Sequence, residues 1–201
     1  MIKNYIFDFG NVLAQFYPDK LTAPFVKDEE TNKRIREVVF DRLYWDKLDW
    51  GHITDDEVKA GICSRLSEED GKIGCMVYDN WVKTMIPVKD MEKLVKDIHN
   101  SGSKLYLLSN ISIGFAKTYC EVKWIKELFD NFDGLVLSGT IGKAKPNKDI
   151  FEHLLKEFDL NPDECLFIDD SPKNIEGAKE VGIDGYIFDG DAHKLREFLG
   201  F

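Results

Sequence analysis

The sequence contains few cysteines, no long uncharged stretch and fewer basic than acidic side chains. Its four cysteines, at positions 63, 75, 120 and 165, form no CxxC pair and match no spacing of metal ligands. The longest stretch without Asp, Glu, Lys or Arg is residues 105–116, which is 12 residues, whereas a membrane-spanning helix needs about 20. The sequence therefore predicts a protein with reduced thiols that does not cross a membrane.

The charge balance also excludes some partners. Asp and Glu number 37 against 27 Lys and Arg, which gives a net charge of −10. This charge opposes general binding to nucleic acid or to an anionic membrane surface, so any anion site must be local. The first residues lack the apolar run and the cleavage site of a signal peptide. We therefore expect a cytoplasmic protein.

What the chain does contain is enough apolar material for a core. Hydrophobic residues make up 43% of 201 residues, which suits one domain with an insertion or two small domains. Short apolar runs that end abruptly in polar residues are typical of strands buried on both faces. Three such runs are residues 5–7, 105–108 and 166–168, and two similar ones are 135–137 and 186–188.

Helical patterns separate these runs, at residues 88–98, 149–158 and 172–181. The alternation predicts an α/β fold, a Rossmann-like parallel sheet flanked by helices, with functional groups at the carboxyl ends of the strands. Residues 15–87 instead show only helical patterns, including the capping box Thr54 to Glu57. We predict a core of residues 1–14 and 88–201, and a small all-helical cap of residues 15–87 inserted after the first strand.

Several polar residues follow the predicted strands. Asp8 can attack an electrophile or bind a hard cation, although a turn aspartate is the simpler interpretation of this residue alone. The adjacent Asp169 and Asp170 repel each other unless a cation such as Mg²⁺ neutralises them; a solvated turn with a helix cap is the alternative. Ser109 and Asn110 can donate to an anion.

Together these residues resemble a known family. Asp8-Phe9-Gly10-Asn11-Val12, Ser109-Asn110, Gly142-x-x-Lys145-Pro146-x-x-x-Ile150-Phe151 and Asp169-Asp170-x-x-x-Asn174 occur in this order over nearly the whole chain. Each motif is weak, but the ordered set resembles that of the haloacid dehalogenase (HAD) superfamily of hydrolases. The Asp-x-Gly-Asn-Val form is similar to the sugar-1-phosphate phosphatase branch.

The resemblance implies a role for each matching residue. Asp8 matches the nucleophile, and Lys145 the lysine that neutralises its charge and that of the phosphoryl group. The implied Mg²⁺ ligands are Asp8, the Gly10 carbonyl and Asp170, with Asp169 helping directly or through water. Ser109 and Asn110 match donors to the phosphate, and Asn174 matches a residue that orients the cluster.

One departure concerns proton transfer. Most phosphatases of the family carry a second Asp two residues after the nucleophile, and here Gly10 stands there. Without an acid, aryl and acyl phosphates should be cleaved about 10²-fold faster than alkyl phosphates, or more. Alternatively, a bound water or the cap supplies the acid. His52 is the candidate from the cap, against the simpler interpretation of a surface histidine in a turn.

These features predict a Mg²⁺-dependent phosphatase that hydrolyses a small phosphomonoester, a sugar phosphate being one candidate, through an aspartyl-phosphate intermediate. The alternative is a catalytically weak or silent protein that binds a phosphorylated metabolite. A structural subunit that binds another protein through its cap would leave all four motifs unused. Dehalogenation needs no Mg²⁺, so the Asp169-Asp170 pair argues against it.

Overall fold

The computed structural model describes residues 2–201. These residues fold around a parallel sheet. Its five strands lie in the order β3-β2-β1-β4-β5, and each adjacent pair is parallel. The strands are β1 (Asn4–Phe7), β2 (Lys104–Ser109), β3 (Gly134–Leu137), β4 (Cys165–Asp169) and β5 (Asp184–Ile187). All five apolar runs contribute to strands, so the predicted α/β fold is confirmed.

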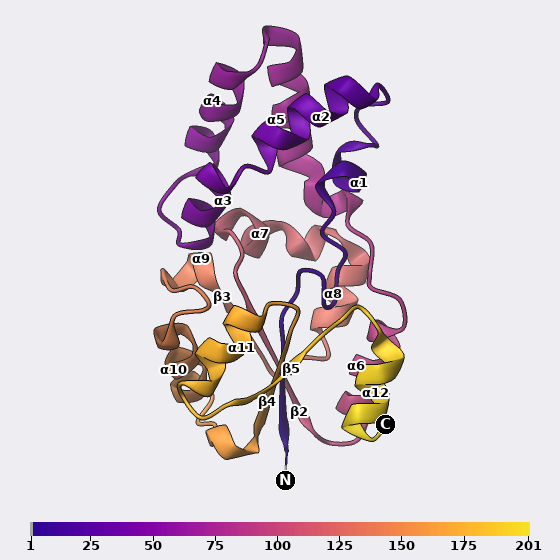
Figure 1. Ribbon diagram of the computed structural model, residues 1–201, viewed down its shortest axis with the longest axis vertical. Helices are drawn as coiled ribbons and strands as arrows, with labels where there is room; N and C mark the ends of the chain where they lie inside the picture. The colour runs from indigo at the N-terminus through magenta and orange to yellow at the C-terminus, as the bar shows by residue number, and fades with distance from the viewer. Residues whose placement is uncertain (1) are drawn as a thin grey trace.

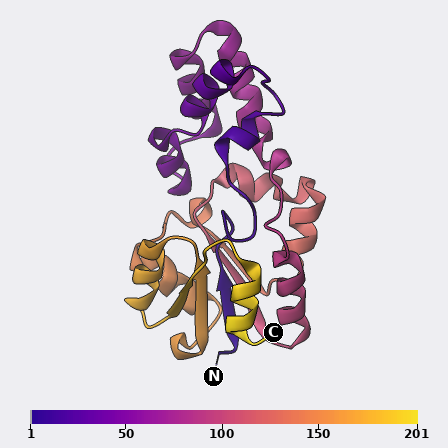
Figure 2. The same cartoon turned by 45° about the vertical axis from the view of Figure 1, so that its right-hand side comes forward.

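Successive strand residues point to opposite faces of the sheet, and both faces are covered. In β1, Phe7 belongs to one apolar cluster and Ile6 to the other. The first cluster includes α6 (Met91–Asn100), α8 (Lys123–Phe129) and α12 (Ala192–Leu199), and the second includes α10 (Lys148–Glu157) and α11 (Pro172–Lys179). Helices α6 and α12 lie on one side of the sheet and α10 and α11 on the other (Figures 1 and 2).

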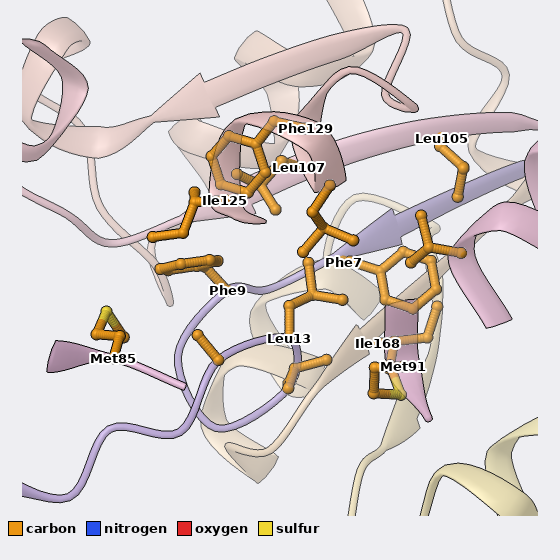
Figure 3. Close-up of a cluster of buried hydrophobic side chains, with 14 of the residues drawn as sticks. Phe7, Phe9, Leu13, Met85, Met91, Leu105, Leu107, Ile125, Phe129 and Ile168 are labelled. Carbon is orange, nitrogen blue, oxygen red and sulfur yellow. The ribbon is translucent and has the colours of Figure 1, made fainter. Parts of the chain in front are cut away.

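The first cluster holds the sheet to its helices around three neighbouring strands. Figure 3 shows Phe7, Leu107 and Ile168, one from each of these strands, together with Met91 of α6 and Phe129 of α8. All five side chains are at most 5% exposed. This packing fixes the strand ends from which the polar residues of the motifs project.

The three helices predicted for the core are also present, with ends within a few residues of those expected. Helix α6 begins at Met91, α10 at Lys148 and α11 at Pro172. Gly102 and Gly182 follow α6 and α11, each with a φ of +85°, a conformation that glycine adopts without steric cost. Shorter elements complete the core: α7 (Ile113–Thr118), η1 (Tyr119–Glu121), α9 (Ser138–Ile141) and η2 (Pro162–Glu164).

Five helices connect β1 to α6 and form the cap, which lies beyond the carboxyl ends of the strands (Figure 1). They are α1 (Pro18–Thr22), α2 (Glu29–Val39), α3 (Arg42–Asp49), α4 (Asp55–Arg65) and α5 (Glu68–Thr84). The predicted capping box starts α4, because Thr54 N donates to Glu57 Oε2 over 2.9 Å and Glu57 N donates to Thr54 Oγ1 over 3.3 Å. The outer part of the cap has its own apolar cluster, which includes Ile35, Val58 and Ile62.

The chain enters and leaves the cap through two adjacent segments. Gln15 N donates to Ile86 O and Val88 N donates to Leu13 O, each over 2.9 Å. The base of the cap joins the first core cluster through Trp81, which lies 6.2 Å from Phe115 of α7, centroid to centroid. Among residues 2–201, no helix is long and apolar enough to cross a membrane.

Candidate active site

The sheet register brings the first site residues together. Phe7 of β1 pairs with Ile168 of β4, so the residues that follow them, Asp8 and Asp169, lie side by side at the carboxyl edge. The Lys145 ammonium lies between them, with Nζ 2.8 Å from Asp8 Oδ1 and 2.7 Å from Asp169 Oδ2. Asp8 is 9% exposed, Lys145 5% and Asp169 0%. A buried cation shared by two carboxylates is therefore the centre of the site.

Asp169 holds this arrangement in place. Asn174 Nδ2, from α11, lies 3.0 Å from both of its carboxylate oxygens, and Ser171 N donates to its Oδ1 over 2.8 Å. Ser171 is at the N-cap of α11, but its side chain makes no capping hydrogen bond. Because Asp169 already receives these donors and Lys145, its geometry favours anchoring the lysine over a place in the first coordination sphere of a cation.

Asp8 is held through one of its two oxygens. Oδ1 accepts hydrogen bonds from Phe9 N over 2.7 Å and from Lys145, whereas Oδ2 accepts none from the described residues. Burial raises the pKa of Asp8 to about 6, the Asp169 charge adds to this, and Lys145 opposes it. Burial alone would lower the pKa of Lys145, but the two carboxylates outweigh it and raise that pKa. Lys145 therefore stays charged.

The carboxylates of Asp8, Asp169 and Asp170 can each place an oxygen within 4.8 Å of the others. Burial and the Asp169 charge raise the pKa of Asp170, and Asn11 Nδ2 lies 3.3 Å from its Oδ2. With Lys145 charged, three carboxylates and one ammonium leave two negative charges, which a divalent cation would neutralise. Carboxylate and carbonyl oxygens are the donors that Mg²⁺ prefers, so this donor set fits Mg²⁺.

The two predicted phosphate donors differ in their environments. The Ser109 hydroxyl lines the cleft and makes no hydrogen bond to any of residues 2–201. The Asn110 side chain instead pairs with the main chain of Lys145: its Nδ2 donates to Lys145 O over 2.9 Å, and its Oδ1 accepts from Lys145 N over 2.8 Å. In this structure Asn110 therefore positions the segment that carries the lysine.

These residues form the floor of a cleft between the core and the cap. Its volume is about 560 Å³, which is within the range of small-molecule sites. Phe16, Phe40, Trp45 and Trp81 form an aromatic wall, with Trp45 and Trp81 5.1 Å apart between centroids. The cleft is thus charged at the floor and apolar along one wall.

Sequence reasoning missed two sets of cleft residues. One side of α3 contributes Arg42, Trp45, Asp46 and Asp49 to the lining; their spacing of three, four and seven residues is a helical signal that could have found them. Asn11 belongs to the first sequence motif, which predicted no role for it, yet it joins the loop after β1 to Asp170. His52 is exposed, stacks on Trp50 at 5.8 Å and is not part of the cleft lining.

A parallel sheet with a helical cap, and a buried aspartate–lysine–aspartate cluster at its carboxyl edge, define a capped α/β hydrolase. The haloacid dehalogenase-like hydrolase family matches residues 2–182 of the chain. The chain therefore belongs to this family and is a hydrolase, as the resemblance in the sequence implied.

Several known proteins are similar to this chain over nearly its whole length. A D-ribitol-5-phosphate phosphatase of Bacteroides thetaiotaomicron is 30% identical, over 92% of this chain and 91% of its own length. A sesquiterpene phosphatase of Aspergillus oryzae is 26% identical, over 98% and 97%. The crystal structure of a wild-type HAD family enzyme from Bacteroides thetaiotaomicron, in complex with magnesium and inorganic phosphate, superposes with a TM-score of 0.72 at 26% identity, covering 97% of this chain and 99% of that one. The chain is thus a phosphatase-like hydrolase.

Proposed function

We propose that this protein is a Mg²⁺-dependent phosphatase that hydrolyses a small phosphomonoester by transferring the phosphoryl group to Asp8. The observation that carries the proposal is the Lys145 ammonium, buried between Asp8 and Asp169 at 2.8 and 2.7 Å. A fixed, desolvated cation beside a carboxylate can stabilise the charge that develops when the carboxylate attacks a phosphate ester.

Each step can be assigned to residues of this chain. Asp8 Oδ1 is held by Phe9 N and Lys145, so Oδ2 attacks phosphorus; an O–P bond forms to Asp8 as the bond to the leaving oxygen breaks. Water then attacks the aspartyl phosphate, which releases inorganic phosphate and restores Asp8. Ser109 donates to a phosphate oxygen, and Lys145 offsets the charge throughout.

The residues that would hold Mg²⁺ are Asp8, Asp170 and the Gly10 carbonyl, and Asp169 would act through a water or through Lys145. When bound, Mg²⁺ would screen the charges of the phosphate and of the carboxylates around it. Asn174 keeps Asp169 oriented by donating to both of its oxygens.

The cleft supports a small substrate. Its volume of about 560 Å³ suits a phosphorylated metabolite. A relative named for a sugar-alcohol phosphate supports sugar phosphates as the first compounds to test. The aromatic wall and a relative named for a sesquiterpene phosphate favour including phosphates of apolar alcohols.

The test is phosphate release from p-nitrophenyl phosphate and from a panel of metabolite phosphates, with Mg²⁺ and with EDTA. We expect turnover that needs Mg²⁺ and falls to background in Asp8→Asn, which keeps the size of the side chain and removes the nucleophile. Binding of phosphate esters without any release would instead identify a silent binding protein. Equal release by Asp8→Asn and the unmodified protein would rule out Asp8 as the nucleophile.

A further inference from the structure

The leaving oxygen of a phosphate ester needs a proton, and Gly10 has no side chain that could donate one. In phosphoryl transfer the attacking and leaving oxygens lie roughly in line, on opposite sides of phosphorus. Asp8 attacks from the floor, so the leaving oxygen points away from the floor, towards the cap. A proton donor for that oxygen must therefore belong to the cap side of the cleft.

Asp49 is a carboxyl group on that side with no partner. It is the last residue of α3 and lines the cleft. Its Oδ1 is shielded from solvent and has no hydrogen-bond partner among the described residues. The other carboxyl that α3 contributes, Asp46, is 59% exposed and pairs with Arg42 at 3.2 Å. A buried oxygen without a partner indicates a ligand that completes its hydrogen bonding.

The end of α3 rests directly on the core, which fixes where Asp49 lies. Gly51 has a φ of +66°, and a Cβ there would lie 2.5 Å from Gly139 O of α9. Across the same contact, a Cβ at Gly139 would lie 3.1 Å from Leu48 O. Gly51 and Gly139 thus allow the end of α3 to contact α9 through the backbone. The contacts are made by Leu48 and Gly51, which lie on either side of Asp49 in the sequence.

The surroundings of Asp49 raise its pKa into the neutral range. Burial, followed by the Asp46 charge, raises its pKa from 3.8 to about 7; Asp8 adds to the shift, whereas Arg42 and Lys145 oppose it. Helix α9, which packs against α3, has no ionisable side chain. An acid whose pKa is close to the working pH is suited to proton donation.

We propose that Asp49 donates the proton to the leaving oxygen. It would replace the aspartate that most phosphatases of the family carry at the position of Gly10. This role rests on the proposed phosphatase function. As the bond between phosphorus and the leaving oxygen breaks, the Asp49 proton passes to that oxygen and an alcohol leaves. The Asp49 carboxylate then takes a proton from the water that attacks the aspartyl phosphate, so each cycle restores the acid.

The test is kcat/KM over a series of leaving groups, from p-nitrophenyl phosphate to simple alkyl phosphates, for the unmodified protein and for Asp49→Asn. An alkoxide leaves poorly without a proton, so alkyl esters should slow by about 10²-fold or more, the usual contribution of a general acid. Nitrophenolate leaves readily, so the aryl ester should slow far less. His52→Ala removes an exposed side chain outside the cleft lining and should keep the dependence of the unmodified protein.

A second variant separates proton donation from a structural role. A Cβ at Gly10 would meet nothing within 4 Å, so an aspartate can be placed where most family members have one. Adding Gly10→Asp to Asp49→Asn should recover alkyl ester hydrolysis. The gain should be larger in Asp49→Asn than in the unmodified protein, which already has an acid; an equal gain in both would overturn the role of Asp49.

The pH profile gives a third readout. For alkyl esters, kcat/KM should fall as the pH rises through the pKa of Asp49, and Asp49→Asn should lose this basic limb while the aryl ester shows little of it. Equal losses on aryl and alkyl esters in Asp49→Asn, or no loss on either, would overturn the role of Asp49 while the protein remained a phosphatase. Absence of turnover on every ester by the unmodified protein would overturn the proposed function itself.

Discussion

At the scale of single residues, Lys145 determines whether two carboxylates can be buried together. In Lys145→Met, Asp8 and Asp169 would face each other without a cation, and breaking such a buried pair costs about 3–5 kcal/mol. We therefore expect the free energy of unfolding in urea to fall by about that amount at pH 8. The loss should be smaller at pH 5, because Asp8, whose pKa is raised, then gains a proton.

Lys148→Met is the matched control. Lys148 Nζ lies 3.9 Å from Glu152 Oε1, and the two side chains are 65% and 55% exposed, so this pair contributes little. A loss of stability in Lys145→Met no larger than in Lys148→Met would show that the buried cluster does not need its cation.

Ionisation of Asp49 as the pH rises should lower the free energy of unfolding. Its pKa is raised in the folded protein to about 7, so between about pH 4 and pH 7 the folded state binds more protons than the unfolded state and stability falls as the pH rises. Asp49→Asn has no carboxyl group at this position, so its stability should not fall with rising pH for this reason. The variant should exceed the unmodified protein by about 1 kcal/mol or more at pH 8, as measured by urea unfolding, and the gain should disappear towards pH 4. A gain independent of pH would contradict the shifted pKa.

The two kinds of site residue differ in how far the sequence could predict them. Asp8, Ser109 and Asp169 follow apolar runs directly, so the strand pattern alone placed them at one edge of the sheet. Asp49 is in a helix whose contact with α9 depends on tertiary packing, which no local pattern encodes. The pairing of Asn110 with the Lys145 main chain also joins residues far apart in the sequence. The amide group of Asn110 predicted a hydrogen-bond donor at this position, but the sequence did not predict which group it would contact.

At the scale of elements, the contact between α3 and α9 can be tested through its glycines. In Gly51→Ala the new Cβ would press on Gly139 O, so the end of α3 must shift and carry Asp49 with it. If Asp49 is the acid, kcat/KM for alkyl phosphates should fall more than kcat/KM for p-nitrophenyl phosphate.

Gly102→Ala provides the control for backbone strain. Gly102 also has a positive φ, +85°, but a Cβ there would meet nothing within 4 Å. Both variants should lose about 1 kcal/mol of stability from the left-handed conformation. Only Gly51→Ala should change the leaving-group dependence; a similar change in Gly102→Ala would assign the effect to general destabilisation.

Element prediction succeeded where burial imposes a strong pattern. Runs of three or four apolar residues marked the central strands, and helices α6, α10 and α11 show apolar residues at helical spacing with a glycine just beyond two of them. Helix α9 is four residues long, which is too short to show any period. Within the cap, the start of α4 was predicted, because the capping box gave a local signal there.

At the scale of the whole molecule, the apolar clusters divide the chain unevenly. The base of the cap shares a cluster with the sheet, through Leu21, Trp81 and Met85. The outer cap has a separate cluster that includes Ile62. The outer cap should therefore open without the sheet, because few apolar contacts connect the two.

Hydrogen exchange on two matched variants tests this division. Ile62 and Ile150 are both 0% exposed, one in the outer cap and one against the sheet, and Ile→Ala at such sites costs about 2–5 kcal/mol. Ile62→Ala should speed amide exchange in α2, α4 and the first half of α5 while β1, β2 and β4 stay protected. Ile150→Ala should speed exchange in those strands. Faster exchange of the strands in Ile62→Ala, to the same degree as in Ile150→Ala, would mean that cap and core unfold as one unit.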